Sequence, residues 1–210
     1  MNKTLQLVGF LIIVMTFNLS FAQASKGDIE LGFGGGINFA TISDFEGETA
    51  NGGYTAFNIA ASGEYYFSDR WGIKMRLIYD NKGWGDGFVT DEEFNTIITD
   101  FRLSYLSIPV MANWHFGKRR NWYLNFGGYV GFLTSAKDTT LSLDVKELLN
   151  STDFGLTLGI GYAFRLNERT RLFIEYDEQL GLSDIFVENP FTNSITNRRS
   201  SFNLGVLFQL

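Results

Sequence analysis

A two-residue alternation of large apolar side chains with small or polar ones recurs eight times along this chain of 210 residues. Residues 29–39 show it first: every odd position except Gly35 carries a large apolar side chain, and every even position carries glycine or a polar side chain. Because successive side chains of a β-strand point to opposite faces, one face of each segment meets apolar surroundings and the other a polar or crowded interior. Strands of a transmembrane barrel have these surroundings, with lipid outside and a polar lumen inside.

The other seven segments with this alternation follow the first at regular intervals. They are residues 57–67, 71–80, 101–116, 122–132, 154–164, 172–177 and 202–210. Most have about ten residues, the length of a tilted strand that crosses a bilayer. In the longest one the apolar positions change parity between Tyr105 and Leu106, which predicts a β-bulge there. We therefore predict an all-β fold, an eight-stranded antiparallel transmembrane up-and-down β-barrel.

The connections between these segments are alternately short and long. Residues 68–70, 117–121 and 167–169 are short turns, whereas residues 41–53, 81–99, 135–152 and 181–197 are long. Outer-membrane barrels have short periplasmic turns and longer outside loops, so an even number of strands places both termini in the periplasm. A soluble barrel is the alternative, but the non-apolar face consists mostly of glycine, alanine, serine and asparagine. These side chains are too small to solvate a whole protein surface, and they suit a narrow lumen.

The first residues have the pattern of a secretory signal. Lys3 precedes the apolar stretch 5–17, and small residues suit cleavage near position 22. We predict a signal peptide over residues 1–22 and one barrel domain over residues 23–210, located in the outer membrane of a Gram-negative bacterium. The absence of cysteine excludes disulfides, and the net charge of −6 argues against nucleic acid as a partner. The expected surroundings are the lipid bilayer and lipopolysaccharide.

The inward positions predict a polar network inside the barrel. Pairing the second and third segments around their short turn sets Glu64 opposite Lys74, and we predict an ion pair between them in the lumen. Arg76 and Glu30 are candidates to share it, because buried charges need partners. Around the next short turn, Asn113 opposes Asn125 and His115 opposes Tyr123. An eight-stranded barrel is just wide enough for its side chains, so we expect this interior to be a polar plug rather than an open pore.

The sequence offers little that predicts catalysis, a metal or a cofactor. The glycine-rich residues 32–36 lie within one strand, whereas a nucleotide-binding loop needs a strand before it and a helix after it. His115 is the only histidine and has no companions at metal-ligand spacing. Its place beside a short turn also differs from the outer-leaflet site of lipid-modifying barrels. We therefore predict no enzyme activity, no catalytic residue, no metal and no cofactor, with a lipid-active enzyme as the least favoured alternative.

Aromatic and acidic side chains gather in the long connections. The candidate binding surface consists of five aromatic residues, Trp84, Phe88, Phe94, Phe186 and Phe191. Exposed aromatics among carboxylates mark binding surfaces. The sequence is equally consistent with the alternative that these side chains pack on one another over the barrel mouth. Residues 145–149 are expected to form a short helix.

Three segments resemble the PorT-like family of outer-membrane β-barrels. They are residues 32–40 (GFGGGINFA), 105–110 (YLSIPV) and 202–208 (FNLGVLF). The resemblance covers nearly the whole predicted barrel domain and implies an eight-stranded barrel in a Gram-negative outer membrane. Some relatives are linked to secretion and gliding machinery. It brings no catalytic residues. The leading hypothesis is a non-enzymatic barrel whose long extracellular loops bind a partner or an envelope component, with a role as an accessory of secretion or envelope machinery as one option. The second hypothesis is a narrow channel for ions or very small solutes.

Overall fold

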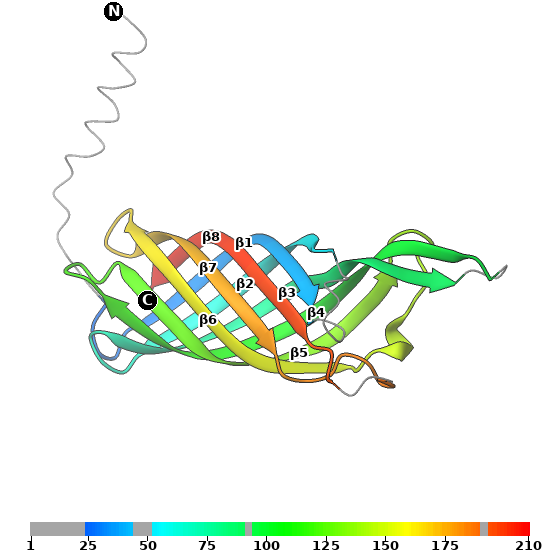
Figure 1. Cartoon of the computed structure of the whole chain (residues 1–210). Helices are drawn as coiled ribbons and strands as arrows, with labels where there is room; N and C mark the ends of the chain where they lie inside the picture. The colour runs from blue at the N-terminus through cyan, green and yellow to red at the C-terminus, as the bar shows by residue number, and fades with distance from the viewer. Residues whose placement is uncertain (1–23, 44–51, 91–93, 190–192) are drawn as a thin grey trace, which may run out of the picture.

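The computed structural model describes residues 24–43, 52–90, 94–189 and 193–210, and it forms one closed barrel of eight antiparallel strands (Figure 1). Each strand pairs with the next in sequence, and β8 pairs with β1. The predicted all-β, up-and-down topology is thus confirmed, while the predicted signal peptide lies outside the described residues. The strands are β1 (Ile29–Ile42), β2 (Tyr54–Tyr66), β3 (Trp71–Thr90), β4 (Thr96–Phe116), β5 (Trp122–Asp138), β6 (Thr152–Arg165), β7 (Thr170–Gly181) and β8 (Asn197–Gln209).

The pairing of neighbouring strands follows the register expected from the short turns. Glu64 lies opposite Lys74 in the β2–β3 pair. In the β4–β5 pair Asn113 lies opposite Asn125 and His115 opposite Tyr123. The register of that pair shifts between Ser104 and Tyr105, next to the position where the apolar parity predicts a bulge. Short turns therefore fix the register of these two hairpins as expected.

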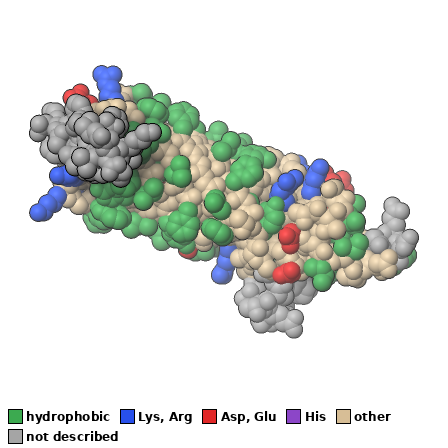
Figure 2. All heavy atoms as spheres, turned by 90° about the horizontal axis from the view of Figure 1, so that it is seen from above, with side chains coloured by type: hydrophobic (Ala, Val, Ile, Leu, Met, Phe, Trp, Pro, Cys, Tyr) green, Lys and Arg blue, Asp and Glu red, His purple; other side chains and the backbone are tan. Residues whose placement is uncertain are grey.

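The two faces of the barrel have the polarity that the alternation predicts. Phe33 on the outward face is 57% exposed, whereas Lys74 on the inward face is 4% exposed. Apolar side chains cover much of the barrel wall, and charged side chains gather toward its two ends (Figure 2). No helix in the described ranges combines the length and the apolar character needed to span a membrane.

The second long connection, residues 81–99, is much shorter in the structure than predicted. Residues 81–99 were expected to form a loop, but β3 continues to Thr90 and β4 begins at Thr96. The ladder of β3 and β4 continues beyond the barrel wall, with pairs such as Phe88–Ile98, after a register shift between Trp84 and Gly87. Three glycines interrupt the apolar alternation in this stretch, which hides the strand from a periodicity argument. The helix expected at residues 145–149 is a single 3₁₀ turn, η1 (Lys146–Leu148).

The C-terminus, the first residue of β1 and the short turns lie at one end of the barrel, called here the short-turn end. The amide of Leu210 donates a hydrogen bond to the carbonyl of Ile29 (3.0 Å), and that of Gln209 donates to the carbonyl of Arg169 (2.8 Å). At the opposite, long-loop end, the loop after β5 contacts the loop after β7, since Asn150 N–H donates a hydrogen bond to the carbonyl of Ile185 (2.8 Å). The projecting β3–β4 hairpin lies at this second end (Figure 1).

Candidate functional site

A network of ion pairs fills the middle of the lumen. Glu175 on β7 accepts hydrogen bonds from Arg76 (Nη1–Oε1 2.7 Å) and Lys74 (Nζ–Oε2 3.3 Å), both on β3. Arg76 also contacts Asp177 Oδ2 at 3.3 Å. The side chains of these four residues are at most 6% exposed. β3 and β7 are not neighbours in the barrel, so these contacts cross the lumen and connect opposite walls.

The same network continues toward the long-loop end. Arg199 on β8 contacts Asp177 Oδ1 at 2.8 Å and Asp80 Oδ2 at 3.4 Å. Lys82 contacts Asp153 Oδ2 at 3.0 Å and is 4.0 Å from Asp80 Oδ2. We call this set the lumen network. Its eight members are Lys74, Arg76, Asp80, Lys82, Asp153, Glu175, Asp177 and Arg199, and all are buried.

The predicted partner of Glu64 is wrong. Glu64 lies directly opposite Lys74 along the β2–β3 ladder, but its carboxylate is hydrogen-bonded to His115 Nε2 at 2.8 Å and accepts from Asn113 Nδ2 at 2.8 Å. Lys74 turns across the lumen to Glu175, and its ammonium group lies 4.9 Å from the centre of the Tyr123 ring. A lysine side chain is long enough to reach across the lumen, so adjacency along the wall does not by itself decide which carboxylate it contacts.

Glu30, the fourth residue predicted for the polar lumen, is buried near the short-turn end and is separate from the lumen network. Its carboxylate pairs with Arg171 of β7, whose Nε donates at 2.9 Å. Arg171 also donates to the hydroxyl of Tyr66 at 3.0 Å. The structure thus places all four predicted residues inside the barrel but joins only Lys74 and Arg76 through a common partner.

Buried charge in the lumen is nearly balanced. Five cations face six carboxylates, and His115 sits against the carboxylate of Glu64. Because an unpaired buried charge is costly, this balance is what a filled interior needs. Among the described residues, the cations are the buried Lys74, Arg76, Lys82 and Arg199 and the half-buried Arg171, and the carboxylates are Glu30, Glu64, Asp80, Asp153, Glu175 and Asp177.

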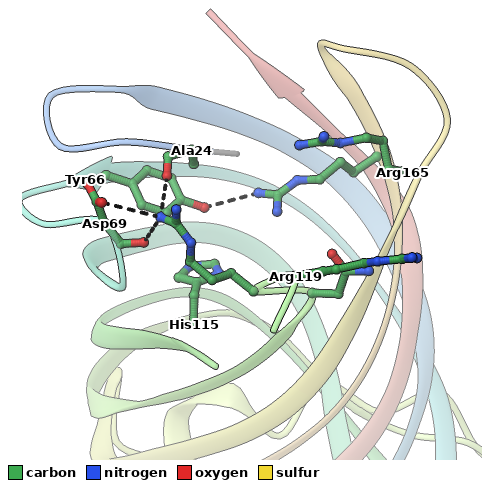
Figure 3. A pocket seen from close by; sticks show the side chains of 9 residues that line it. Ala24, Tyr66, Asp69, His115, Arg119 and Arg165 are labelled. Carbon is green, nitrogen blue, oxygen red and sulfur yellow. Dashed lines mark hydrogen bonds and ion pairs between the residues drawn. The ribbon is translucent and has the colours of Figure 1, made fainter. Parts of the chain in front are cut away.

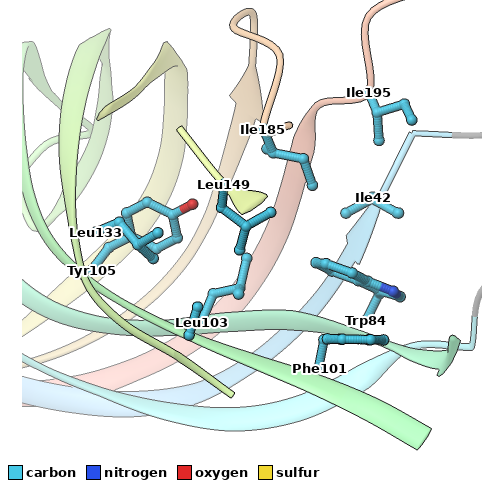
Figure 4. Close-up of a cluster of buried hydrophobic side chains, with 10 residues drawn as sticks. Ile42, Trp84, Phe101, Leu103, Tyr105, Leu133, Leu149, Ile185 and Ile195 are labelled. Carbon is cyan, nitrogen blue, oxygen red and sulfur yellow. The ribbon is translucent and has the colours of Figure 1, made fainter. Parts of the chain in front are cut away.

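An apolar cluster closes the lumen at the long-loop end (Figure 4). Trp84 stacks on Phe101 with ring centres 4.7 Å apart, and Leu149 and Ile185 from the two long loops pack into the same cluster. We call it the mouth cluster. Its buried members are Ile42, Trp84, Phe101, Leu103, Tyr105, Leu133, Ala136, Leu149, Ile185 and Ile195. The mouth cluster lies above the lumen network, so polar and apolar layers fill the barrel in succession.

The five aromatic residues predicted as a loop surface do not form one surface. Trp84 is 5% exposed and belongs to the mouth cluster, because β3 extends through this position and points its indole inward. Phe186 packs against the same cluster. Phe88 and Phe94 are 72% and 89% exposed. Phe191 lies outside the described residues. Trp84 and Phe186 therefore pack over the barrel mouth, as the alternative hypothesis expects, and do not form an exposed binding surface.

The loop after β5 is held by a single carboxylate beyond the lipid-facing part of the wall. Asp138 accepts hydrogen bonds from the backbone N–H groups of Thr140 (3.0 Å) and Leu141 (2.6 Å), and from that of Leu143. Burial raises the pKa of the Asp138 carboxyl, but these backbone donors together lower it by more, so the pKa lies below its ordinary value. The carboxylate therefore stabilises this loop at neutral pH.

A two-stranded ribbon projects from the long-loop end. It consists of residues 87–90 of β3 and 96–99 of β4, which among the described strands pair only with each other. Phe88 and Ile98 form a cross-strand pair, and each is 72% exposed. These side chains extend past the part of the wall where β3 and β4 have other strand neighbours, so no described strand covers them. The ribbon is the part of the predicted loop surface that remains accessible.

No group of three or more histidine, cysteine or acidic side chains in the described part of the chain could hold a metal ion. His115 is buried, and its ring lies between Tyr66 (ring centres 5.0 Å apart) and Tyr123 (6.0 Å). Its ring nitrogen contacts Glu64 and Asn113. These contacts position His115 as a structural member of the lumen.

The fold, the lipid-facing wall and the filled polar lumen define a small transmembrane barrel of the outer-membrane type. The chain belongs to the outer membrane protein β-barrel domain family, whose pattern matches residues 21–187. No curated protein matches it in sequence.

Several solved structures similar to the chain are bacterial outer-membrane barrels. OprG from Pseudomonas aeruginosa is 13% identical with a TM-score of 0.56, over 90% of this chain and 98% of that one. Neisserial surface protein A is 14% identical with a TM-score of 0.54, over 86% and 96%. The N-terminal barrel domain of P. aeruginosa OprF is 13% identical with a TM-score of 0.50, over 89% and 100%. At these identities the likeness extends to the fold alone.

Proposed function

We propose that this protein is a non-enzymatic outer-membrane barrel that binds a partner or an envelope component through the ribbon at its long-loop end. The single observation that carries the proposal is the exposed Phe88–Ile98 pair on a ribbon outside the lipid-facing wall. Exposed apolar and aromatic groups of this kind are typical of interaction sites. The open backbone edges of the ribbon can also add a strand of a partner.

The topology of the chain supports the expected orientation. We propose that residues 1–22 are removed as a signal peptide, and that the short-turn end with both termini faces the periplasm. The ribbon and lipopolysaccharide would then share the cell surface. The resemblance to PorT-like barrels supports secretion or envelope machinery as the setting of this binding.

Shortening Phe88 and Ile98 together to alanine is expected to reduce partner binding at least tenfold. Truncation of a central interface aromatic costs about 2 kcal/mol or more, and about 1.4 kcal/mol corresponds to tenfold. The measurement is the yield of cross-linked complex in intact cells from a photoreactive group placed at Thr90, which is exposed on the same ribbon.

The matched control is Leu148→Ala, since Leu148 is 64% exposed at the same end of the barrel but lies in η1, outside the ribbon. Both variants leave the wall and the lumen network unchanged. Equal cross-linking yields in wild type, the double variant and the control would contradict binding by the ribbon.

The charged lumen favours a narrow ion channel as the second candidate, but its contents oppose conduction. Ion pairs join β3 to β7 across the lumen, and the mouth cluster covers the long-loop end. We therefore expect the purified barrel to give no discrete conductance steps in planar bilayers. Reproducible steps whose ion selectivity changes in Arg76→Ala would instead establish the channel.

A further inference from the structure

A pocket opens at the short-turn end, where the barrel mouth meets two of the short turns (Figure 3). Its enclosed part measures about 10 Å³, room for about one water molecule, and the rest of the space is open to solvent. Its charged lining comprises Asp69, Arg119, Arg120, Arg165 and Arg171, with His115 at the base. In Figure 3, Arg119 and Arg165 lie on one side of the pocket, and Tyr66 and Asp69 lie on the other. A ligand would therefore bind at the open side of the pocket, and four guanidinium groups against Asp69 and the Glu30 that pairs with Arg171 favour an anion.

Arg171 and Arg120 are held in place by hydrogen bonds to other parts of the protein. Arg171 is fixed by Glu30 and by the hydroxyl of Tyr66, to which it donates at 3.0 Å. Arg120 donates to the carbonyls of Ala24 (2.9 Å) and Asp69. A guanidinium fixed by contacts on one side loses little further freedom when it binds a ligand. These two residues give the pocket a preorganised wall.

Arg165 and Arg171 lie directly opposite each other in the β6–β7 ladder. Like charges at such a cross-strand position repel each other. Glu30 pairs with Arg171, and Glu168 is near enough to Arg165 to interact electrostatically. An anion between the two guanidinium groups would reduce their repulsion.

The charge of the short-turn end is opposite in sign to that of the protein. The described short turns and the strand ends beside them carry eight lysines and arginines against four acidic residues, whereas the whole chain has a net charge of −6. The basic residues are Lys26, Arg70, Lys118, Arg119, Arg120, Arg165, Arg169 and Arg171, and the acidic ones are Asp28, Glu30, Asp69 and Glu168. A local excess of positive charge raises the concentration of anions at this mouth.

We propose that this pocket binds a phosphate group, with Arg165 and Arg171 as its central ligands and Arg119 and Arg120 at its sides. A carboxylate is satisfied by one guanidinium fork, whereas a phosphate presents more oxygens and a higher charge, which suits several arginines. The phosphate can come from a phospholipid headgroup of the adjoining leaflet or from a free phosphorylated molecule. This proposal is independent of the ribbon and holds whichever partner the ribbon binds.

The test uses the folded full-length barrel in nanodiscs of phosphatidylcholine, with inorganic phosphate added at constant ionic strength. The readouts are the guanidinium NMR resonances of Arg165 and Arg171 and the thermal midpoint of unfolding. In wild type we expect both resonances to shift saturably and the unfolding midpoint to rise as phosphate is added. In Arg165→Gln we expect at least tenfold weaker binding, measured from the Arg171 resonance and the unfolding midpoint. Arg119→Gln is expected to weaken binding as well, and since Arg119 is exposed on a turn, its loss leaves the barrel folded.

The matched control is Arg102→Gln, which removes the same charge from an exposed position of β4 near the long-loop end and should bind phosphate like wild type. A second arm replaces part of the phosphatidylcholine with phosphatidylglycerol and adds no phosphate. Shifts of the same resonances in that arm identify the lipid headgroup as a source, and shifts only with inorganic phosphate identify a free anion. The proposal is overturned if neither arm shifts them, if Arg165→Gln and Arg102→Gln behave alike, or if acetate binds as tightly as phosphate.

Discussion

Glu175→Gln is expected to lower the free energy of unfolding of the barrel by about 3–5 kcal/mol, the usual cost of removing one partner from a buried ion pair. Glu175 contacts both Lys74 and Arg76 and also accepts from Asn125 Nδ2 at 3.1 Å. Its neutral replacement removes the carboxylate that Lys74 and Arg76 share, so that in the lumen network four cations face three carboxylates. Urea titration of the barrel folded in lipid vesicles measures the loss.

Two further variants separate the ion network from a general effect of lost charge. Glu147→Gln removes the same charge from an exposed position of η1 and is expected to change stability by less than about 0.5 kcal/mol. Lys74→Met combined with Glu175→Gln removes a buried cation together with its carboxylate, so it should recover part of the loss. A loss in Glu175→Gln no larger than in Glu147→Gln would mean that water in the lumen compensates the charges instead.

The fold was predictable because the lipid-facing wall imposes a strict period of two on every strand. Phe33 and Lys74 lie on the faces that their parity predicts, and the register of Glu64 opposite Lys74 follows from one short turn. The ion-pair partner of Lys74 could not be predicted from this register, because Glu175 contacts Lys74 across the lumen from β7. Strand pairing determines neighbours along the wall, but contacts across a barrel depend on strand tilt and side-chain length.

The residues at the two ends of the barrel differ in how well the sequence predicts their contacts. The pairing of Arg165 with Arg171 was available in principle, because both residues flank a short turn whose register the alternation predicts. The mouth cluster was not, because Leu149 and Ile185 lie in long loops that have no period. Trp84 was misplaced for a related reason: glycines at positions 83, 85 and 87 interrupt the alternation in a segment that continues as a strand.

A methyl group added at Gly205 is expected to prevent normal closure of the barrel. Gly205 lies opposite Gly34 in the β1–β8 pair, and the Phe173 ring covers both glycines from the lumen. A Cβ at position 205 would overlap the carbonyl oxygen of Phe33 and would lie 2.6 Å from both Gly34 Cα and Phe173 Cε1. The ring could turn away, but the backbone of β1 could move only by opening the seam that joins the first and last strands.

The matched control is Gly63→Ala, which, unlike Gly205→Ala, is not expected to lower stability. Replacing glycine by alanine in a strand with free space gains about 0.5–1 kcal/mol. At Gly63 the nearest atom to an added Cβ is Leu31 Cδ2 at 3.9 Å, so Gly63→Ala should be neutral or stabilising. Overpacking typically lowers stability by about 1–3 kcal/mol, and by more where the added atom meets backbone. Most of the Gly205→Ala protein should therefore be missing from the heat-modifiable band that folded barrel gives on gels. Equal folded fractions for the two variants would show that the glycine pair is not required for closure. They would also show that the β1–β8 pair can accommodate an added methyl group beside Phe173.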